Sequence, residues 1–255
     1  MILDMHAHIW NTQFDDVDTI VSEMDDVGLD QVCVLPIAPY MTNEDIAAVV
    51  ARKPDRFIGF ASVVPFAATT SIPRTDPVDA LAQAVQELGL KGLKLHPLIQ
   101  GFSMSDPGLA PVVQAAGELG IPVIFHTGPS YGRAGRSENG RIELLDDLAI
   151  MCPNTVIIAG HASPLGDAPY IAHKHPNVYL ETSLAWSRYC SLIPGLARQA
   201  VDIAGVEKIV FGSDFSLGKR ERVTDMIDVF DKAGLSESES ELIYSGNAKR
   251  ILGLD

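Results

Sequence analysis

The segment PVIFHTG, residues 122–128, is a short apolar run that ends in histidine, threonine and glycine. Its length and its content of Val, Ile and Phe are typical of a buried strand in a parallel sheet. Seven further runs of this kind occur along the 255 residues: ILDMHAH (2–8), QVCVLP (31–36), FIGFASV (57–63), GLKLHP (92–97), VIIAGHA (156–162), VYLETS (178–183) and KIVFGSD (208–214). The sequence therefore predicts eight strands.

Segments with apolar residues at helical spacing lie between these runs. They cover residues 15–28, 76–89, 107–120, 139–151, 192–205 and 222–234. Because strand and helix alternate, the expected sheet is parallel with helical crossovers. The chain length of 255 residues also matches one eightfold barrel of about 250 residues. We predict an α/β fold, a single-domain (β/α)₈ TIM barrel over residues 1–255, with an open doubly wound sheet as the alternative.

The positions of the polar residues favour the barrel over the open sheet. His8, His96, His126, His161 and Asp214 each fall at or near the carboxyl end of an apolar run. In a barrel these strand ends converge on one face, which is where active sites form. In an open sheet they would be spread along an edge.

Two histidines in the first run suggest a metal site. His6 and His8 are two residues apart, so on a strand both side chains point to the same side and can chelate one cation. Neutral imidazole suits Zn²⁺ and related ions. The pair alone also fits hydrogen-bonded structural histidines. Asp214 similarly fits either a carboxylate at the metal or the N-cap of a following helix.

Taken together, the motifs DMHAH, GLKLHP, IFHTG, AGHAS, FGSD and GNAKRIL occur in this order along nearly the whole chain. This arrangement resembles the amidohydrolase superfamily, and most closely its branch that includes aminocarboxymuconate-semialdehyde decarboxylase. The combination of the first-strand HxH with the final-strand aspartate is specific, whereas each motif alone is not. The resemblance implies a TIM-barrel enzyme, and it implies that Asn247 begins a structural C-terminal helix.

The resemblance also implies roles for individual residues. It implies one divalent metal ion, for which imidazole ligands favour Zn²⁺, held by His6, His8, His126 and Asp214. Asp214 would in addition act as the general base, and His161 would lie beside the metal and polarise the substrate or the water.

Lys94 and His96 face the same side of the fourth predicted strand. In binuclear members of the superfamily a carbamylated lysine at this strand bridges two metals, and this is one reading of Lys94. Contact of Lys94 or His96 with the substrate is a second reading, and a supporting structural role is a third.

Two further segments are expected to select the substrate. The loop at residues 127–140 carries Arg133 and Arg136, which could bind a substrate carboxylate or could belong to a solvated loop. Trp186, with Arg188 and Tyr189, follows the seventh strand and is expected to line the pocket.

These features predict a metal-dependent hydrolase. Its substrate would be an ester, lactone or amide of a small carboxylate-bearing molecule, attacked by metal-activated water with Asp214 as the base. The alternative is a non-oxidative, metal-dependent decarboxylase of an aromatic or dienoic acid. A barrel that binds a ligand without turnover is the third reading.

Composition sets the expected partners. The formal net charge of −14 argues against nucleic acid. The chain contains neither an apolar run of about 18 residues nor a signal-peptide pattern, so we expect no membrane span and a cytoplasmic location. Cys33, Cys152 and Cys190 form no CxxC pair and fit reduced thiols. The resemblance also implies a homodimer.

Overall fold

Eight short parallel strands form the centre of the molecule. The computed structural model describes residues 1–10, 16–38, 40–66, 76–128 and 135–254. The strands are β1 (Leu3–Ala7), β2 (Gln31–Val34), β3 (Phe57–Gly59), β4 (Leu93–Leu95), β5 (Val123–His126), β6 (Ile157–Gly160), β7 (Val178–Glu181) and β8 (Ile209–Val210). Each lies inside one of the eight apolar runs, which confirms the strand prediction.

The strands pair in chain order. One sheet contains β1 to β3 and the other contains β4 to β8, and all pairs are parallel. Isolated parallel bridges join Ala61 to Leu93 between the sheets at one seam and Ala7 to Phe215 at the other. These contacts close the ring, so the TIM-barrel prediction is confirmed and the open sheet is excluded.

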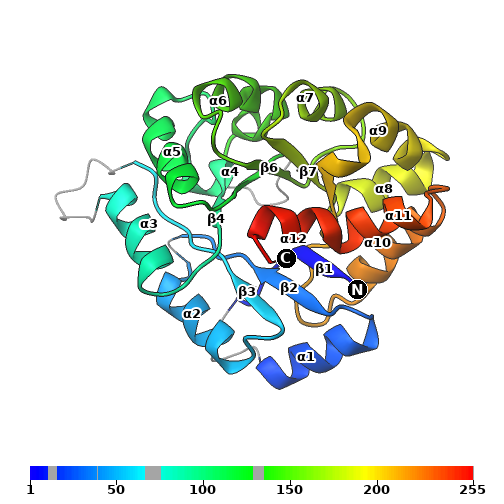
Figure 1. The fold of residues 1–255 in the computed structure, drawn as a ribbon, viewed down its shortest axis with the longest axis horizontal. Coiled ribbons are helices and arrows are strands. Elements are labelled where there is room, and N and C mark those ends of the chain that lie inside the picture. The colour runs from blue at the N-terminus through cyan, green and yellow to red at the C-terminus, as the bar shows by residue number, and fades with distance from the viewer. Residues whose placement is uncertain (11–15, 39, 67–75, 129–134, 255) are drawn as a thin grey trace.

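Helices surround this ring (Figure 1). They are α1 (Val17–Asp26), α2 (Asn43–Arg52), α3 (Pro77–Gln86), α4 (Pro97–Gln100), α5 (Ala110–Glu118), α6 (Leu145–Met151), α7 (Ala168–Lys174), α8 (Ala185–Leu192), α9 (Leu196–Ala204), α10 (Glu221–Asp231), α11 (Glu237–Glu241) and α12 (Asn247–Leu252). Every predicted helical segment overlaps one of them, with α10 beginning one residue before its predicted segment. Helix α2 was not predicted, although Thr42 and Asp45 form a capping box at its start.

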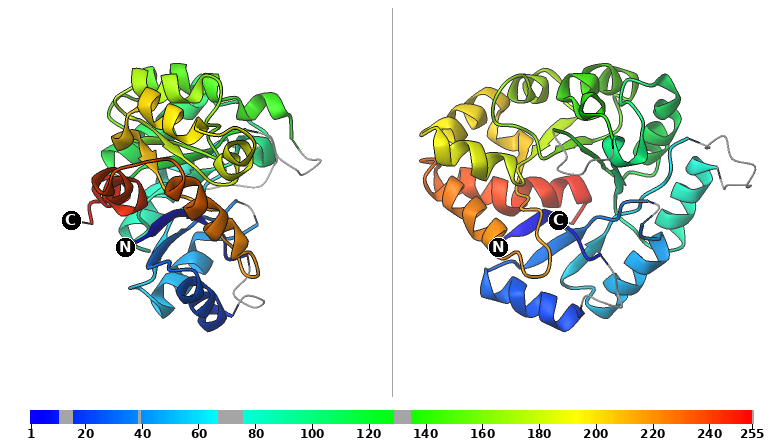
Figure 2. Two further views of the ribbon diagram at one scale, coloured as in Figure 1. Left: turned by 90° about the vertical axis from the view of Figure 1, so that its right-hand side faces the viewer. Right: turned by 180° about the vertical axis from the view of Figure 1, so that it is seen from behind.

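The core has an outer and an inner part. Most buried apolar side chains fill the layer between the strands and the helices. A smaller group fills the barrel itself: Leu3, Met5, Cys33, Leu35, Ile58, Phe60, Ile124, Ile158 and Val210. Ala248 of α12 packs against this inner group, and Asn247 donates hydrogen bonds to the carbonyls of Val206 and Ile209. Helix α12 therefore covers one end of the barrel, as two further views also show (Figure 2), and the other end is left for a site.

Candidate active site

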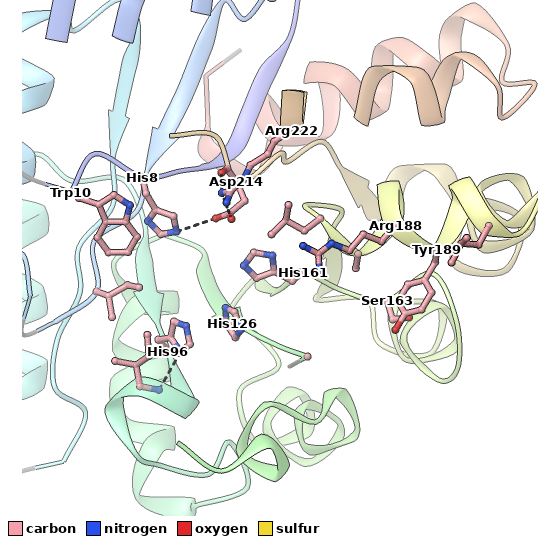
Figure 3. A pocket seen from close by; sticks show the side chains of 16 residues that line it. His8, Trp10, His96, His126, His161, Ser163, Arg188, Tyr189, Asp214 and Arg222 are labelled. Atoms are coloured by element: carbon pink, nitrogen blue, oxygen red, sulfur yellow. Dashed lines mark hydrogen bonds and ion pairs between the residues drawn. The ribbon is translucent and has the colours of Figure 1, made fainter. Parts of the chain in front are cut away.

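The carboxyl ends of the strands surround one cavity of about 460 Å³. Its walls include all five polar residues that the sequence placed at strand ends, namely His8, His96, His126, His161 and Asp214. They approach from β1, β4, β5, β6 and β8, so positions more than 200 residues apart in sequence share one space (Figure 3). The convergence expected of a barrel is therefore observed.

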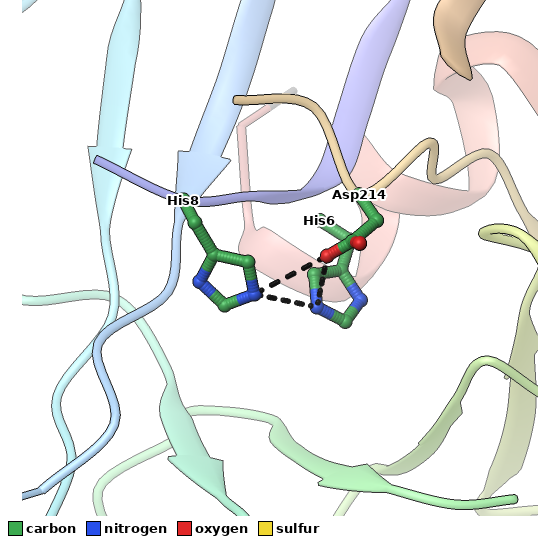
Figure 4. A group of neighbouring side chains, drawn as sticks. All are labelled: His6, His8 and Asp214. Carbon is green, nitrogen blue, oxygen red and sulfur yellow. Dashed lines mark hydrogen bonds and ion pairs between the residues drawn. The ribbon is translucent and has the colours of Figure 1, made fainter. Parts of the chain in front are cut away.

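Three of the predicted metal ligands lie in direct contact (Figure 4). Nε2 of His6 lies 3.2 Å from Nε2 of His8. Oδ1 of Asp214 lies 3.3 Å from the His8 nitrogen and 3.7 Å from the His6 nitrogen. Two imidazole nitrogens and one carboxylate oxygen can hold a first-row divalent cation.

The outer nitrogens of these histidines show that the group fits a metal. Nδ1 of His8 lies 2.7 Å from the carbonyl of Leu35, and Nδ1 of His6 lies 2.7 Å from Oε2 of Glu181. Both partners only accept, so each Nδ1 must carry the proton. When both rings are neutral, the two Nε2 atoms present lone pairs to each other at 3.2 Å. A cation between them would remove this repulsion, as in carboxylate–histidine–metal triads.

His126 offers a further donor beside this group. Its Nε2 is buried and has no hydrogen-bond partner among the described residues, which is costly unless a ligand occupies it. Burial holds the pKa of His126 far below its ordinary value, so the ring is neutral. It stacks on His96 with 3.9 Å between ring centroids. His126 thus fits the predicted role, although it lies outside the tight group of His6, His8 and Asp214.

His161 is oriented by residues that follow β7. Its Nδ1 lies 2.8 Å from Oγ of Ser183 and 3.3 Å from the Ser183 carbonyl. Because the carbonyl only accepts, Nδ1 carries the proton and Nε2 keeps the lone pair. Burial lowers the pKa of His161, so the neutral ring acts as an acceptor. The family resemblance implied that His161 polarises the substrate or the water, and in this tautomer Nε2 can accept a hydrogen bond from either.

Glu181 connects several of these strands through its carboxylate. The carboxylate is fully buried at the end of β7. Besides His6 Nδ1, Oε2 accepts from the backbone N–H of His161 at 3.0 Å and from Oγ of Ser183 at 2.9 Å. The other carboxylate oxygen of Glu181, Oε1, accepts a hydrogen bond from the backbone N–H of Ser183 at 2.6 Å. One carboxylate thus aligns β1, β6 and β7 at the site. Ser183 was missed, because a serine after a strand gives no distinctive sequence signal.

Lys94 and His96 lie in different parts of the barrel: Lys94 is in its interior and His96 is at the cavity. The Lys94 side chain is fully buried in the barrel, where Nζ lies 3.3 Å from Nε2 of His6. Burial lowers the pKa of Lys94 to about 8, against the opposing effect of Glu181 and Asp214. His96 lines the cavity and caps α4 by accepting from the backbone N–H of Ile99. Only His96 therefore faces the space where a substrate would lie.

Asp214 adopts an unusual backbone conformation, with a φ of 62°. It is not a helix N-cap, because α10 begins only at Glu221. Burial alone would raise the pKa of Asp214, but its hydrogen bond with His8 and the positive charge that the neighbouring histidines carry when protonated hold this pKa well below its usual range. Nη1 of Arg222 lies 2.5 Å from the Asp214 Oδ2. Arg222 also lines the cavity and was not anticipated from the sequence.

Comparison with known proteins identifies the family. The sequence profile of the amidohydrolase family matches residues 3–254. The chain belongs to the amidohydrolase family. A Dictyostelium discoideum 2-amino-3-carboxymuconate-6-semialdehyde decarboxylase is 25% identical over 254 residues, covering 87% of this chain and 67% of the relative. The resemblance read from the motifs is thereby confirmed.

Solved structures agree with this amidohydrolase fold. A 2,6-dihydroxybenzoate decarboxylase from Rhizobium has a TM-score of 0.72 at 19% identity, with 100% and 98% of the two chains covered. A dihydroxybenzoic acid decarboxylase from Polaromonas, with bound manganese and 2-nitroresorcinol, has a TM-score of 0.71 at 20% identity. The match covers 99% of this chain and 97% of that chain. A probable 2-pyrone-4,6-dicarboxylic acid hydrolase from Acinetobacter baumannii has a TM-score of 0.66 at 18% identity, and the match covers 99% of each chain. At these identities the likeness establishes the fold.

Of the three remaining predicted substrate contacts, the two that the structure describes do not line this amidohydrolase cavity. Arg133 lies outside the described residues. Arg136 is exposed and pairs with Glu138 at 2.7 Å, so it is not a wall of the cavity. The expectation for Trp186 is corrected: its indole is fully buried, donates to the carbonyl of Ala162 at 3.0 Å and packs against Phe230. The face of helix α8 that carries Trp186 is turned toward the core.

The walls that this amidohydrolase does present are mainly apolar. Trp10, Arg188 and Tyr189 line the cavity, as do the side chains of Ile37, Ile99, Leu184, Ala185 and Leu192. Leu184 precedes α8 with a φ of 56°, and α8 then presents Ala185, Arg188, Tyr189 and Leu192 to the cavity. None of the helices in the described ranges is long and apolar enough to cross a bilayer.

Proposed function

We propose that this amidohydrolase is a non-oxidative, metal-dependent decarboxylase of a small aromatic or dienoic acid. This reaction is the alternative to hydrolysis that the sequence left open. The names of the relatives favour it, because the curated relative and two of the structural neighbours described above are decarboxylases. The observation that carries the proposal is the convergence of His6, His8 and Asp214 at a mostly apolar cavity.

The proposed cofactor is one divalent ion held by His6, His8, His126 and Asp214. Imidazole donors favour Zn²⁺, and manganese is the ion named for the Polaromonas neighbour. When bound, the ion would supply Lewis-acid polarisation of a substrate oxygen. Two of its imidazole ligands, His6 and His8, are held in one tautomer by Glu181 and by the Leu35 carbonyl, so neither has to change tautomer to bind.

The protein residues account for the proton that decarboxylation requires. Loss of CO₂ leaves the electron pair of the broken C–C bond on the substrate carbon, and one proton must then be delivered to that carbon. We assign this proton transfer to Asp214, whose Oδ1 is directed toward the histidines at the cavity: the ionised carboxylate takes up one proton from solvent, passes it to that carbon and is ionised again when the cycle ends. The neutral His161 accepts a hydrogen bond from a hydroxyl or amino group of the substrate and thereby orients it.

The cavity supports a substrate of one ring or a short conjugated chain. A volume of about 460 Å³ lies within the range of roughly 300–1,000 Å³ that is usual for small-molecule sites. Trp10, Tyr189 and the aliphatic side chains provide flat apolar contacts, and Arg188 provides a positive charge at the mouth. An acid with an apolar body matches both features.

Hydrolysis of a lactone or ester is the second candidate. It is favoured by the Acinetobacter neighbour, a probable hydrolase of a pyrone dicarboxylic acid. The same metal donors and the same Asp214 would serve such a reaction. A barrel that only binds a ligand is disfavoured by the complete set of His6, His8, His126, His161 and Asp214.

Parallel assays separate these functions. Purified protein, loaded with Zn²⁺ or Mn²⁺, is offered hydroxybenzoates and dienoic acids with CO₂ release measured, and lactones and esters with acid release measured. We expect CO₂ release that is abolished by a chelator and restored by metal. Acid release from lactones without CO₂ release would assign the hydrolase, and no turnover in either panel would favour the non-catalytic barrel.

Metal content and assembly are tested on the same sample. We propose one metal per chain, and two equivalents in elemental analysis would favour carbamylated Lys94 and a second ion. A homodimer and a cytoplasmic location are also proposed. Light scattering that gives the mass of a single chain would remove the dimer.

A further inference from the structure

A single nitrogen of Arg222 holds both the backbone and the side chain of Asp214. Nη1 lies 2.5 Å from the carbonyl oxygen of Asp214 and 2.5 Å from Oδ2. Arg222 is the second residue of α10, and its side chain is only 27% exposed, so the ion pair is partly shielded from water. Figure 3 shows Arg222 reaching Asp214 at the wall of the cavity.

The two carboxylate oxygens of Asp214 therefore have different partners. Oδ2 is occupied by Arg222, while Oδ1 faces the Nε2 atoms of His8 at 3.3 Å and His6 at 3.7 Å. A carboxylate can offer a cation either one oxygen or both. Here the guanidinium holds the second oxygen away from the histidines.

The backbone contact fixes this orientation. The φ of 62° at Asp214 lies in the left-handed region, which is uncommon for non-glycine residues and which contacts with the surroundings can stabilise. The hydrogen bond from Arg222 to the Asp214 carbonyl provides such a contact. Because both contacts come from one nitrogen, the backbone conformation and the carboxylate rotamer are set together.

We infer that Arg222 is a positioning residue that limits Asp214 to one oxygen, Oδ1, toward the divalent ion. This inference rests on the proposed metal site. With Oδ2 neutralised by a guanidinium, Asp214 is a weak ligand that remains available for proton transfer. Without Arg222, both oxygens would turn to the ion, and Asp214 would bind more strongly but transfer protons poorly.

The test uses Co²⁺ as a spectroscopic probe in the full-length protein. Arg222→Met, Arg222→Lys and the wild type are titrated with Co²⁺, and visible absorption, affinity and turnover are compared. Arg222→Met is expected to bind Co²⁺ at least as tightly as wild type, to show an altered absorption band and to lose about tenfold or more in turnover. Arg222→Lys should lie between them, because one nitrogen makes both contacts.

Two controls separate positioning from a general structural effect. Arg220 lies beside the start of α10 and pairs with Asp26 at 2.7 Å on the surface, so Arg220→Met should leave the spectrum and turnover unchanged. In an Asp214→Asn background, Arg222→Met should have no additional effect on the spectrum, because the two residues act as one unit.

An absorption band in Arg222→Met identical to that of wild type would overturn the inference. So would loss of Co²⁺ from a folded Arg222→Met protein, since Arg222 would then merely hold Asp214 in place. If Arg222→Met fails to fold, the Arg222→Lys spectrum decides, and an unchanged band with unchanged turnover overturns the proposal. A wild-type protein that binds no Co²⁺ would overturn the proposed metal site and this inference with it.

Discussion

Nδ1 of His6 lies 2.7 Å from Oε2 of Glu181, and both side chains are fully buried inside the barrel. His6 is in β1 and Glu181 ends β7, two strands that do not pair with each other. Burial lowers the pKa of His6, so the contact is a hydrogen bond from a neutral imidazole to a carboxylate. This relationship fixes which nitrogen of His6 is turned toward His8 and Asp214.

Replacement of Glu181 should weaken metal binding. We expect Glu181→Gln to fold but to lose about 10- to 100-fold in affinity for Zn²⁺ or Mn²⁺, because His6 loses the charged acceptor that orients it. Competition with a chromophoric chelator measures the affinity. Glu143→Gln, which removes an exposed partner of Arg141, is the control. Equal affinities in the three proteins would contradict this role.

Asp214→Asn should separate metal binding from turnover. The imidazoles of His6, His8 and His126 remain, so the fold and most of the metal are expected to be retained. Turnover should fall by about 10²-fold or more, which is the loss expected for removal of a proton-transfer group. His8→Ala, in contrast, should lose metal and activity together. Near-normal turnover in Asp214→Asn would show that another residue transfers the proton, and His161 would then be the next candidate.

Arg188 should determine the affinity for the acid. It lines the cavity from α8, whereas Arg136 is exposed and pairs with Glu138. Arg188→Met is expected to raise KM for a substrate with a second acidic group by about tenfold or more, with a smaller effect on kcat, because a charged hydrogen bond is lost. Arg136→Met serves as the matched control. Equal KM values in both variants would exclude an anchoring role for Arg188.

The start of α11 should contribute a pH-dependent stability. The backbone N–H of Ser236 and the guanidinium of Arg198 donate to Glu239 and lower its pKa from the ordinary 4.5 to about 2. Because the folded-state pKa is the lower one, the stabilisation is complete above pH 4.5 and is lost as the pH falls toward 2.

We therefore expect Glu239→Gln to lower Tm at neutral pH, and the difference from wild type to shrink as the pH falls below 4.5. Thermal unfolding measured across this pH range tests the prediction. Glu237→Gln is the control, because it removes one negative charge from the same turn and leaves the capping box of Ser236 and Glu239 intact. A difference that persists unchanged at low pH would show that the effect is not electrostatic.

The strands could be located from sequence because burial leaves a local signature. A strand inside a barrel must be apolar at nearly every position, so runs such as VIIAGHA stand out without knowledge of their neighbours. The histidines were recognisable for the same reason, since a polar residue that closes such a run is unusual. Trp186 misled the prediction, because an aromatic residue after a strand fits a cavity wall and a core equally well, and only the packing of α8 against Phe230 decides between them.

The sequence by itself determined that His6, His8, His126, His161 and Asp214 would meet, because strand order and strand ends place them on one face of any eightfold barrel. Only the tertiary structure decided how they are oriented. The proton positions on His6 and His161 depend on Glu181 at the end of β7 and on Ser183 just after it, and the oxygen that Asp214 presents depends on Arg222 from α10. Hydrogen bonds act over about 3 Å between residues far apart in the chain, and no local pattern of residues encodes such contacts.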